Sequence, residues 1–231
     1  MMSRSAQPFL AGFAPVTPAS RPGRRAAPGA RVLHRSRAAF RRGEPCHVTL
    51  RVREDVPSLR SVRLVRELER SFADACERGE FRLVHYSLQG NHAHLIVEAK
   101  DRGALGRGMK SIAARLARAV NRVFRRKGPV LADRYRVRVL TSPRQVRNAI
   151  AYVLLNARKH MAEAGRKLSL TEADVDPASS GRWFDGWKRG SEPTAPPEER
   201  SPVAEPRFWL LATGWRRRGG GLIHPAEIPG H

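Results

Sequence analysis

Two histidines flank a single alanine in residues 91–97, which read Asn-His-Ala-His-Leu-Ile-Val. The apolar residues predict a β-strand, and side chains alternate between the two faces of a strand. His92 and His94 should therefore point to the same side, with Cα atoms about 6.6 Å apart. Two imidazoles on one side can share a metal ion, but histidines at this spacing also occur as ordinary surface residues. The spacing alone leaves both interpretations open.

A metal ion held in this way would polarise a scissile phosphate, and a separate oxygen would attack the phosphorus. The chain has three tyrosines that could supply this oxygen. Tyr86 and Tyr135 fall in expected strands and are interpreted as packing residues. Tyr152 lies in an expected helix four residues before Asn156, so phenol and amide should share one helical face. Without further context, a helix tyrosine is more often a core residue than a nucleophile. Basic residues near this helix are candidate phosphate contacts: Arg147, Lys159 and His160.

The elements that must position these residues follow from hydrophobic spacing. Alternating or continuous apolar residues predict strands, and apolar residues at intervals of three and four predict helices. The expected strands cover residues 47–52, 81–88, 92–99 and 135–141, and the expected helices cover 57–78, 105–126 and 143–159. The first six elements follow a β-α-β-β-α-β order, the ferredoxin-like split arrangement of an antiparallel sheet with helices on one face. The sequence therefore predicts an α+β fold with one additional C-terminal helix, which carries Tyr152 and lies beside the sheet.

The segments on either side of this core differ from it in composition. Residues 1–43 contain nine arginines and no acidic residue, so we expect a basic arm that is disordered until it meets a polyanion. Residues 44–165 should form the functional domain. Residues 166–231 are expected to be an accessory tail that is partly linker. Within this tail, Pro and Glu dominate residues 193–206, and two stretches are candidates for a small appended element: residues 207–215 and 222–228.

The charge of the chain indicates a polyanionic partner. Lys and Arg number 44 against 21 Asp and Glu, which gives a formal net charge of +23. Arginine dominates the basic residues, and its planar guanidinium suits phosphate oxygens, so nucleic acid is the leading candidate. An arginine-rich composition that reflects only codon usage is the alternative explanation. The arginines expected to contact DNA lie on the helix over 105–126 and on the strand over 135–141 or beside it: Arg115, Arg118, Arg122, Arg125, Arg134, Arg136 and Arg138.

Nothing in the sequence indicates a membrane partner or secretion. No apolar run approaches the roughly 20 residues needed to cross a bilayer. Prolines interrupt the N-terminal apolar residues where a signal peptide would need a continuous core. Cys46 and Cys76 lack the spacing of a disulfide framework or a zinc knuckle. We therefore expect a protein of the reducing cytoplasm.

Taken together, these motifs resemble those of the single-tyrosine HUH transposases, particularly the REP-associated tyrosine transposases of the IS200-like family. Residues 90–97 are similar to the family's Asn-His-x-His-Leu strand, and residues 152–156 to its Tyr-x-x-x-Asn helix. The triplet Asp133-Arg134-Tyr135 is similar to a recurrent element before the final strand. The resemblance covers roughly residues 44–162, so it says nothing of the arm or the tail.

This resemblance implies a mechanism and a set of roles. His92 and His94 would bind a divalent metal, Mg²⁺ or Mn²⁺, with Asn156 as the third ligand, and Tyr152 would attack single-stranded DNA folded into hairpins. The products would be a 5′-phosphotyrosine and a free 3′-hydroxyl, which can rejoin strands in DNA transposition and recombination. The protein would be bacterial and associated with the nucleoid. Relatives act as monomers or dimers, so a homodimer stays open. His47 and His85 are alternative ligands, but we interpret them as ordinary sheet histidines.

Two other functions are weighed against this one. The first is a non-catalytic nucleic-acid-binding protein of ferredoxin-like fold, which would stack bases on aromatic residues of its central strands. The expected histidine strand carries no aromatic ring of that kind, and aromatic residues make up only 6% of the chain. The second is a zinc-stabilised structural protein, but two histidines without neighbouring cysteines do not complete a tetrahedral site.

Overall fold

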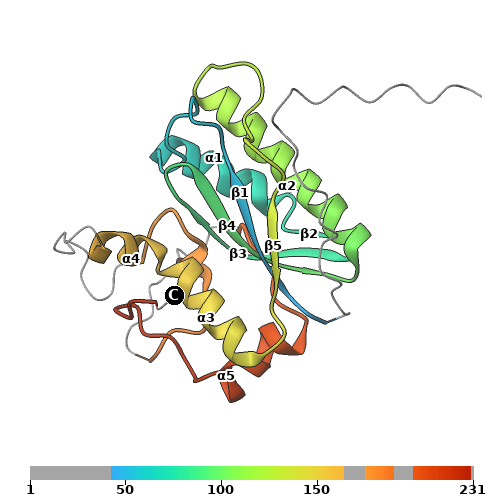
Figure 1. The fold of residues 1–231 in the computed structure, drawn as a ribbon, viewed down its shortest axis with the longest axis vertical. Coiled ribbons are helices and arrows are strands. Elements are labelled where there is room, and N and C mark those ends of the chain that lie inside the picture. The colour runs from blue at the N-terminus through green and yellow to red at the C-terminus, as the bar shows by residue number, and fades with distance from the viewer. Residues whose placement is uncertain (1–42, 164–174, 190–199, 230–231) are drawn as a thin grey trace, which may run out of the picture. The chain divides into compact units, whose positions relative to one another are not determined.

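The computed structural model describes residues 43–163, 175–189 and 200–229 (Figure 1). The basic arm expected over residues 1–43 lies outside the described residues apart from Gly43, and so does the side chain of His160. No helix among the described residues is both long and apolar enough to cross a membrane.

One antiparallel sheet with the order β2-β3-β4-β1-β5 forms the centre of the fold. Its strands are β1 (Cys46–Arg51), β2 (Glu77–Arg78), β3 (Phe81–Leu88), β4 (His92–Ala99) and β5 (Arg136–Val139). Apart from the two-residue β2, this is the predicted ferredoxin-like split arrangement, and the α+β prediction is confirmed. Strand β1 lies between β4 and β5 and pairs with both.

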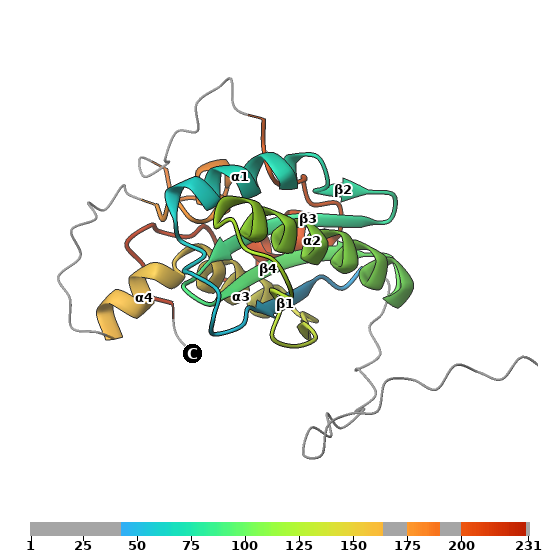
Figure 2. The ribbon, with the colours of Figure 1, turned by 90° about the horizontal axis from the view of Figure 1, so that it is seen from above.

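Two helices cover one face of the sheet. These are α1 (Val62–Ala73) and α2 (Arg102–Val123), which lie side by side in both views (Figures 1 and 2). Asp101 caps α2 by accepting a hydrogen bond from the Ala104 amide at 2.7 Å. The helix ends at Val123 rather than near 126, because Arg125 adopts a left-handed backbone with φ +49°. Gly108 allows α2 to approach β3 closely, since a Cβ there would lie 2.1 Å from the Phe81 ring.

A third helix, α3 (Pro143–Leu154), covers the other face of the sheet. Ser142 accepts a hydrogen bond from the Gln145 amide, and proline occupies the first turn, so the start of this helix was readable from sequence. The end was not: the single helix predicted over 143–159 is wrong. Leu155 leaves the helical backbone at φ −108° and ψ 15°, and a separate helix, α4 (Asn156–Glu163), follows. Tyr152 and Asn156 therefore lie on different helices.

The described tail contacts both faces of the sheet: much of it packs against the face that α3 covers, and other parts reach α1 on the opposite face. It contains η1 (Ser180–Trp183), the π-helical turn η2 (Leu210–Gly214) and α5 (Trp215–Arg218). Phe184, Trp187 and Trp215 join residues of α3 in a second hydrophobic core. The tail also covers part of the outer edge of β3, where the Leu88 amide donates to the Ala178 carbonyl at 2.8 Å.

A buried carboxylate holds the second tail segment in place. Glu98 of β4 is fully buried and accepts hydrogen bonds from the backbone amides of Arg207 and Phe208, at 2.9 and 2.8 Å, just before η2. Burial raises the pKa of Glu98, although these two amides and Arg82 oppose the rise. The small element expected over residues 207–215 is therefore tied directly to the strand that carries the histidine pair.

Candidate active site

Three neighbouring strands present polar side chains to the face that α3 covers. His92 and His94 belong to β4, and the antiparallel register places Thr49 of β1 opposite His94. His47 is two residues before Thr49 on β1, so it shares the same face. Arg138 of β5 lies opposite His47. The register therefore collects two strand histidines, a third histidine, a hydroxyl and a guanidinium on one surface.

The two predicted histidines lie in direct contact. The Nε2 atoms of His92 and His94 are 3.0 Å apart, and the two rings are nearly perpendicular at 85°. Asn91 Oδ1 lies 2.8 Å from Nδ1 of His92, so the amide oxygen can hold that nitrogen as the N–H donor, which makes Nε2 the nitrogen that carries the lone pair. On the other ring, Nδ1 of His94 lies 3.1 Å from His47 Nε2 and 3.3 Å from Thr49 Oγ1. Both Nε2 atoms thus point toward one place, and a neighbouring polar group contacts each Nδ1.

Tyr152 reaches this cluster from α3. Its ring centre lies 5.1 Å from that of His94 and 5.8 Å from that of His47, both in edge-on contacts. Lys159, on α4, places its ammonium 5.1 Å from the centre of the phenol ring. The break at Leu155 separates the two helices, so this contact depends on the bend between them. The phenol of Tyr152 is half-buried and has a cation beside it.

These groups line a cavity of about 390 Å³. Its lining is rich in histidine, amide and basic side chains and contains no carboxylate: His47, Thr49, His94, Arg138, Leu140, Gln145, Asn148, Ala149, Tyr152 and Lys159. Burial lowers the pKa of His47 to about 4, and the nearby Arg138 adds to the effect, so this ring is neutral near pH 7. The cavity therefore offers positive charge and neutral donors, which suit an anionic ligand.

The donor set fits a divalent ion. Two nitrogens that each bind one ion at about 2.1 Å, at right angles, lie roughly 3 Å apart, which matches the separation of the two Nε2 atoms. Asn156 is fully buried, and neither atom of its amide has a hydrogen-bond partner within the described part of the chain. Such an orphaned amide needs a partner, and a metal ion is one that its oxygen can take. Groups of three His, Cys, Asp or Glu side chains that could hold a metal ion do not occur among the described residues.

The arginines predicted to contact DNA fall into two groups. Arg136 and Arg138 lie on β5 beside the cavity, with Arg134 exposed just before that strand. The second group lies on α2 or just after it, on the face of the sheet away from the cavity. Two of these four arginines contact α1. Arg115 donates to the Ser71 carbonyl at 3.1 Å, and Arg122 pairs with Glu67 at 2.6 Å. The remaining two of this group are exposed: Arg118 and Arg125.

The other candidates from sequence have structural surroundings of their own. Arg147 forms a two-pronged ion pair with Glu227 at 2.8 and 2.9 Å, so it anchors the tail. His85 packs edge-on against Phe184, with ring centres 5.2 Å apart, and does not line the histidine cavity. Tyr86 is fully buried and donates its hydroxyl hydrogen to Glu69.

Sequence reasoning missed part of the cavity lining. Thr49 was detectable, because it lies two residues after His47 on an expected strand and must share its face. Asn148 and Gln145 precede Tyr152 by four and seven residues, which is the spacing of one helical face. Once Tyr152 is chosen as a candidate, counting four and seven residues toward the N-terminus identifies these two side-chain amides, just as counting four toward the C-terminus identified Asn156.

Comparison with known proteins assigns the domain that contains the site. Residues 45–155 match the family model described as Transposase IS200 like. The fold is similar to that of a REP-associated tyrosine transposase bound to a REP hairpin, at 14% identity and a TM-score of 0.43, over 55% of this chain and 73% of the other. It is also similar to a protein from Deinococcus radiodurans R1 assigned as a transposase, at 15% identity and a TM-score of 0.36, over 46% of this chain and 85% of the other.

No protein with curated annotation matches this chain in sequence. The family match nevertheless spans all five strands and the helix that carries Tyr152. It therefore contains every strand that lines the cavity. Residues 45–155 are therefore a domain of the IS200-like transposase family.

Proposed function

We propose that this transposase cleaves and rejoins single-stranded DNA, with Tyr152 as the nucleophile and a divalent metal held by His92 and His94. The observation that carries the proposal is the meeting of Tyr152, His94 and Lys159 around one cavity, with His92 in contact with His94. The centre of the phenol ring lies 5.1 Å from the centre of the His94 ring and 5.1 Å from the Lys159 ammonium. A neutral phenol is a weak nucleophile, and a cation beside it stabilises negative charge on the attacking oxygen. These parts suit an attack on a phosphodiester.

The proposed step is a transesterification. The phenol oxygen of Tyr152 forms a bond to phosphorus, and the bond from phosphorus to the 3′ oxygen of the preceding nucleotide breaks. The phenol loses its proton and the leaving 3′ oxygen gains one, which leaves a 5′-phosphotyrosine and a free 3′-hydroxyl. One phosphodiester is exchanged for another, so no nucleotide cofactor is needed. A 3′-hydroxyl can then attack the phosphotyrosine and restore a DNA strand.

Each residue around the cavity has a proposed part in this step. A divalent ion, Mg²⁺ or Mn²⁺, would supply Lewis-acid polarisation of the phosphate, held by His92 and His94 with Asn156 as the candidate third ligand. Thr49 and His47 hold the His94 ring through its Nδ1 atom. Arg138 and Lys159, which line the cavity, would bind the phosphate oxygens.

We further propose that the substrate is DNA folded into a hairpin. The similar REP-associated transposase is bound to a REP hairpin, and the net charge of +23 suits a polyanion of this kind. Arg136, on the site face of β5, would extend the contact beyond the cavity.

The oligomeric state is a separate question. Sedimentation of the protein with and without a hairpin will distinguish a monomer from a homodimer.

The decisive experiment is capture of the covalent intermediate. The protein is incubated with hairpin-bearing single-stranded DNA and Mg²⁺ or Mn²⁺, and a denaturing gel is examined for a protein–DNA adduct. We expect an adduct with the native protein and none with Tyr152→Phe, which should still bind DNA in a gel-shift assay. An adduct formed by Tyr152→Phe would show that another residue is the nucleophile. Binding without any adduct by the native protein would favour a non-catalytic nucleic-acid-binding module.

The metal assignment is tested separately. His92→Ala and His94→Ala should each abolish the adduct at saturating Mn²⁺, and a chelator should abolish it in the native protein. As a matched control, His224→Ala removes a histidine of the tail that lies outside the cavity and should leave adduct formation intact. Full activity in both strand variants would refute the metal site.

A further inference from the structure

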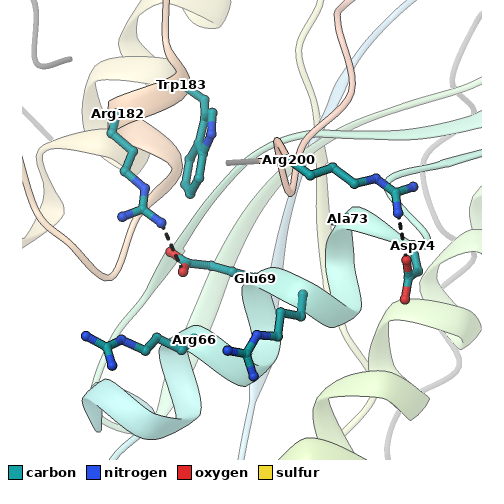
Figure 3. Close-up of a pocket in the computed structure, with 8 residues that line it drawn as sticks. Arg66, Glu69, Ala73, Asp74, Arg182, Trp183 and Arg200 are labelled. Atoms are coloured by element: carbon teal, nitrogen blue, oxygen red, sulfur yellow. Dashed lines mark hydrogen bonds and ion pairs between the residues drawn. The ribbon is translucent and has the colours of Figure 1, made fainter. Parts of the chain in front are cut away.

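A second basic hollow lies between α1 and the tail, and it shares no residue with the histidine cavity (Figure 3). Its volume is about 660 Å³. It is bordered by α1, the helix on the face of the sheet away from α3. Four arginines, one tryptophan and two carboxylates line it: Arg66, Glu69, Arg70, Ala73, Asp74, Arg182, Trp183 and Arg200.

Two of these arginines are exposed and carry uncompensated charge. Arg66 and Arg70 are four residues apart on α1, so they share one face of the helix. Within the ranges that the structure describes, neither guanidinium has a hydrogen-bond or ion-pair partner. The two carboxylates of the hollow are already paired, because Arg182 contacts Glu69 at 3.0 Å and Arg200 contacts Asp74 at 3.0 Å. The net charge of the hollow is therefore that of Arg66 and Arg70.

The same two arginines line a neighbouring hollow of about 470 Å³. That hollow is also bordered by α1 and by the end of α2: Val62, Arg63, Arg66, Glu67, Arg70, Arg122 and Val123. Arg66 and Arg70 thus form a ridge between two depressions. A strand of nucleic acid that crosses α1 would bring its phosphates onto this ridge and its bases into the hollows on either side.

Trp183 is held in position at the side of the first hollow. The Arg182 guanidinium lies 4.0 Å from the centre of the Trp183 ring. Glu69, which pairs with Arg182, also accepts a hydrogen bond from the buried Tyr86 hydroxyl at 3.3 Å. The stack is therefore anchored in the core. Figure 3 shows the half-buried indole standing between Arg182 and Arg200 at the hollow. Its Nε1 has no hydrogen-bond partner among the residues described.

We propose that this hollow is a second DNA-binding site, which holds two neighbouring phosphates of single-stranded DNA on Arg66 and Arg70 and an unstacked base against Trp183. Guanidinium forks match phosphate oxygens, and a fixed aromatic ring beside them is the combination with which proteins bind single strands independently of sequence. The choice of DNA as the polyanion rests on the proposed function. The site would hold the substrate on the far side of the sheet from the reacting phosphate.

The test compares two variants with equal loss of charge. Arg66→Gln/Arg70→Gln removes the ridge, and Arg217→Gln/Arg218→Gln removes two exposed arginines of α5. Affinity for a labelled single-stranded oligonucleotide is measured by fluorescence anisotropy across a salt series. Two lost phosphate contacts should lower the slope of log affinity against log salt by about 1.4, so the ridge variant's defect should be about sevenfold larger at 50 mM than at 200 mM salt. Equal slopes for the two variants would overturn the proposal, because net charge would then explain the effect.

The aromatic part is tested with an oligonucleotide that lacks bases. Trp183→Leu should weaken binding of the ordinary single strand but bind an abasic strand of equal length as the native protein does. Thermal melting verifies that this variant is folded. If Trp183→Leu weakens both ligands equally, stacking of an unpaired base is refuted. If the ridge variant loses as much affinity for a blunt duplex as for the single strand, the preference of the site for single strands is refuted.

Adduct formation separates this inference from the proposed function. In the ridge variant, the DNA concentration that gives half-maximal adduct should rise in proportion to the loss of affinity. Native protein that forms no adduct would contradict the proposed chemistry and leave the anisotropy result to decide the second site. Native protein that forms the adduct, with a ridge variant that binds DNA as tightly as the native protein, would refute the second site alone.

Discussion

The buried His85 should make the stability of this protein depend steeply on pH. Its side chain packs edge-on against Phe184, and its Nδ1 is buried without a partner among the described residues. Burial lowers the pKa of His85 to about 4, an effect that Asp185 opposes and Arg216 reinforces. The folded protein therefore binds a proton at His85 less tightly than the unfolded chain, whose pKa is about 6.5.

The sign and size of the effect follow from this difference. Stability from the neutral ring is fully present above pH 6.5 and is lost as the pH falls toward 4, because only the unfolded chain takes up the proton in that window. A difference of about 2.5 pKa units corresponds to about 3 kcal/mol at its limit, of which about 2 to 3 kcal/mol should be expressed at pH 4.5. His47 has a similar shift, and its contribution cancels when two variants with intact His47 are compared.

The assay is urea unfolding at pH 7.5 and pH 4.5 for the native protein, His85→Leu and Phe184→Leu. Native protein and Phe184→Leu should both lose stability on acidification, and His85→Leu should lose about 2 to 3 kcal/mol less. Phe184→Leu is the matched control, because it disturbs the same contact and keeps the titrating ring. An equal loss in all three proteins would refute the assignment. His85→Leu should also retain metal-dependent adduct formation, as expected of a packing residue rather than a ligand.

Three further predictions concern the cavity and the tail. Thr49→Val should raise the Mn²⁺ concentration needed for half-maximal adduct by about 10- to 100-fold, because it removes the hydroxyl that contacts Nδ1 of the proposed ligand His94. Thr49→Ser keeps the hydroxyl and should behave as the native protein. Lys159→Gln should slow adduct formation about tenfold, because the reacting phosphate loses a cation of the cavity wall; an unchanged rate at saturating DNA would exclude this role. Asp176→Asn should lower the free energy of unfolding by about 2 to 3 kcal/mol, because the carboxylate is buried and receives two 2.8 Å hydrogen bonds from Arg60. A change below about 0.5 kcal/mol in urea unfolding would show that this ion pair is unimportant to stability.

Four of the five strands and their order were predictable, because each carries alternating or continuous apolar residues. β2 was not, since residues 77 and 78 were expected to end the helix over 57–78, whereas α1 ends at Ala73. The pattern around His47 and the apolar run after His94 fixed which side chains share a face, and the register confirmed that these two strands are neighbours. The hairpin between β3 and β4 was equally clear from the short polar turn at Gly90. The spacing of apolar residues along a strand sets which side chains face the core, and this in turn restricts how the strand pairs with its neighbours.

The break after α3 was not predictable, because no residue near it is a helix breaker. Leu155 and Asn156 both fit a continuing helix, and only tertiary packing selects the bend. The expectation that Tyr152 and Asn156 lie on one continuous helix failed for this reason, and the contact of Lys159 with the phenol ring is made across the same bend. The sequence likewise could not show that Arg115 and Arg122 contact α1, because a helical arginine stripe looks the same whether it faces solvent or a neighbouring helix.

The second hydrophobic core sets a lower limit on how far the chain can be shortened and still fold around α3. One side of α3 rests on the sheet, and residues of the tail such as Phe184, Trp187 and Trp215 complete the apolar surroundings of this helix. A protein trimmed to the span that the family shares would expose those surfaces to water and leave the tyrosine helix without its outer support. The part of the chain that folds together therefore extends beyond residues 45–155, the span that the family shares. A shortened protein intended for work with DNA has to retain the tail.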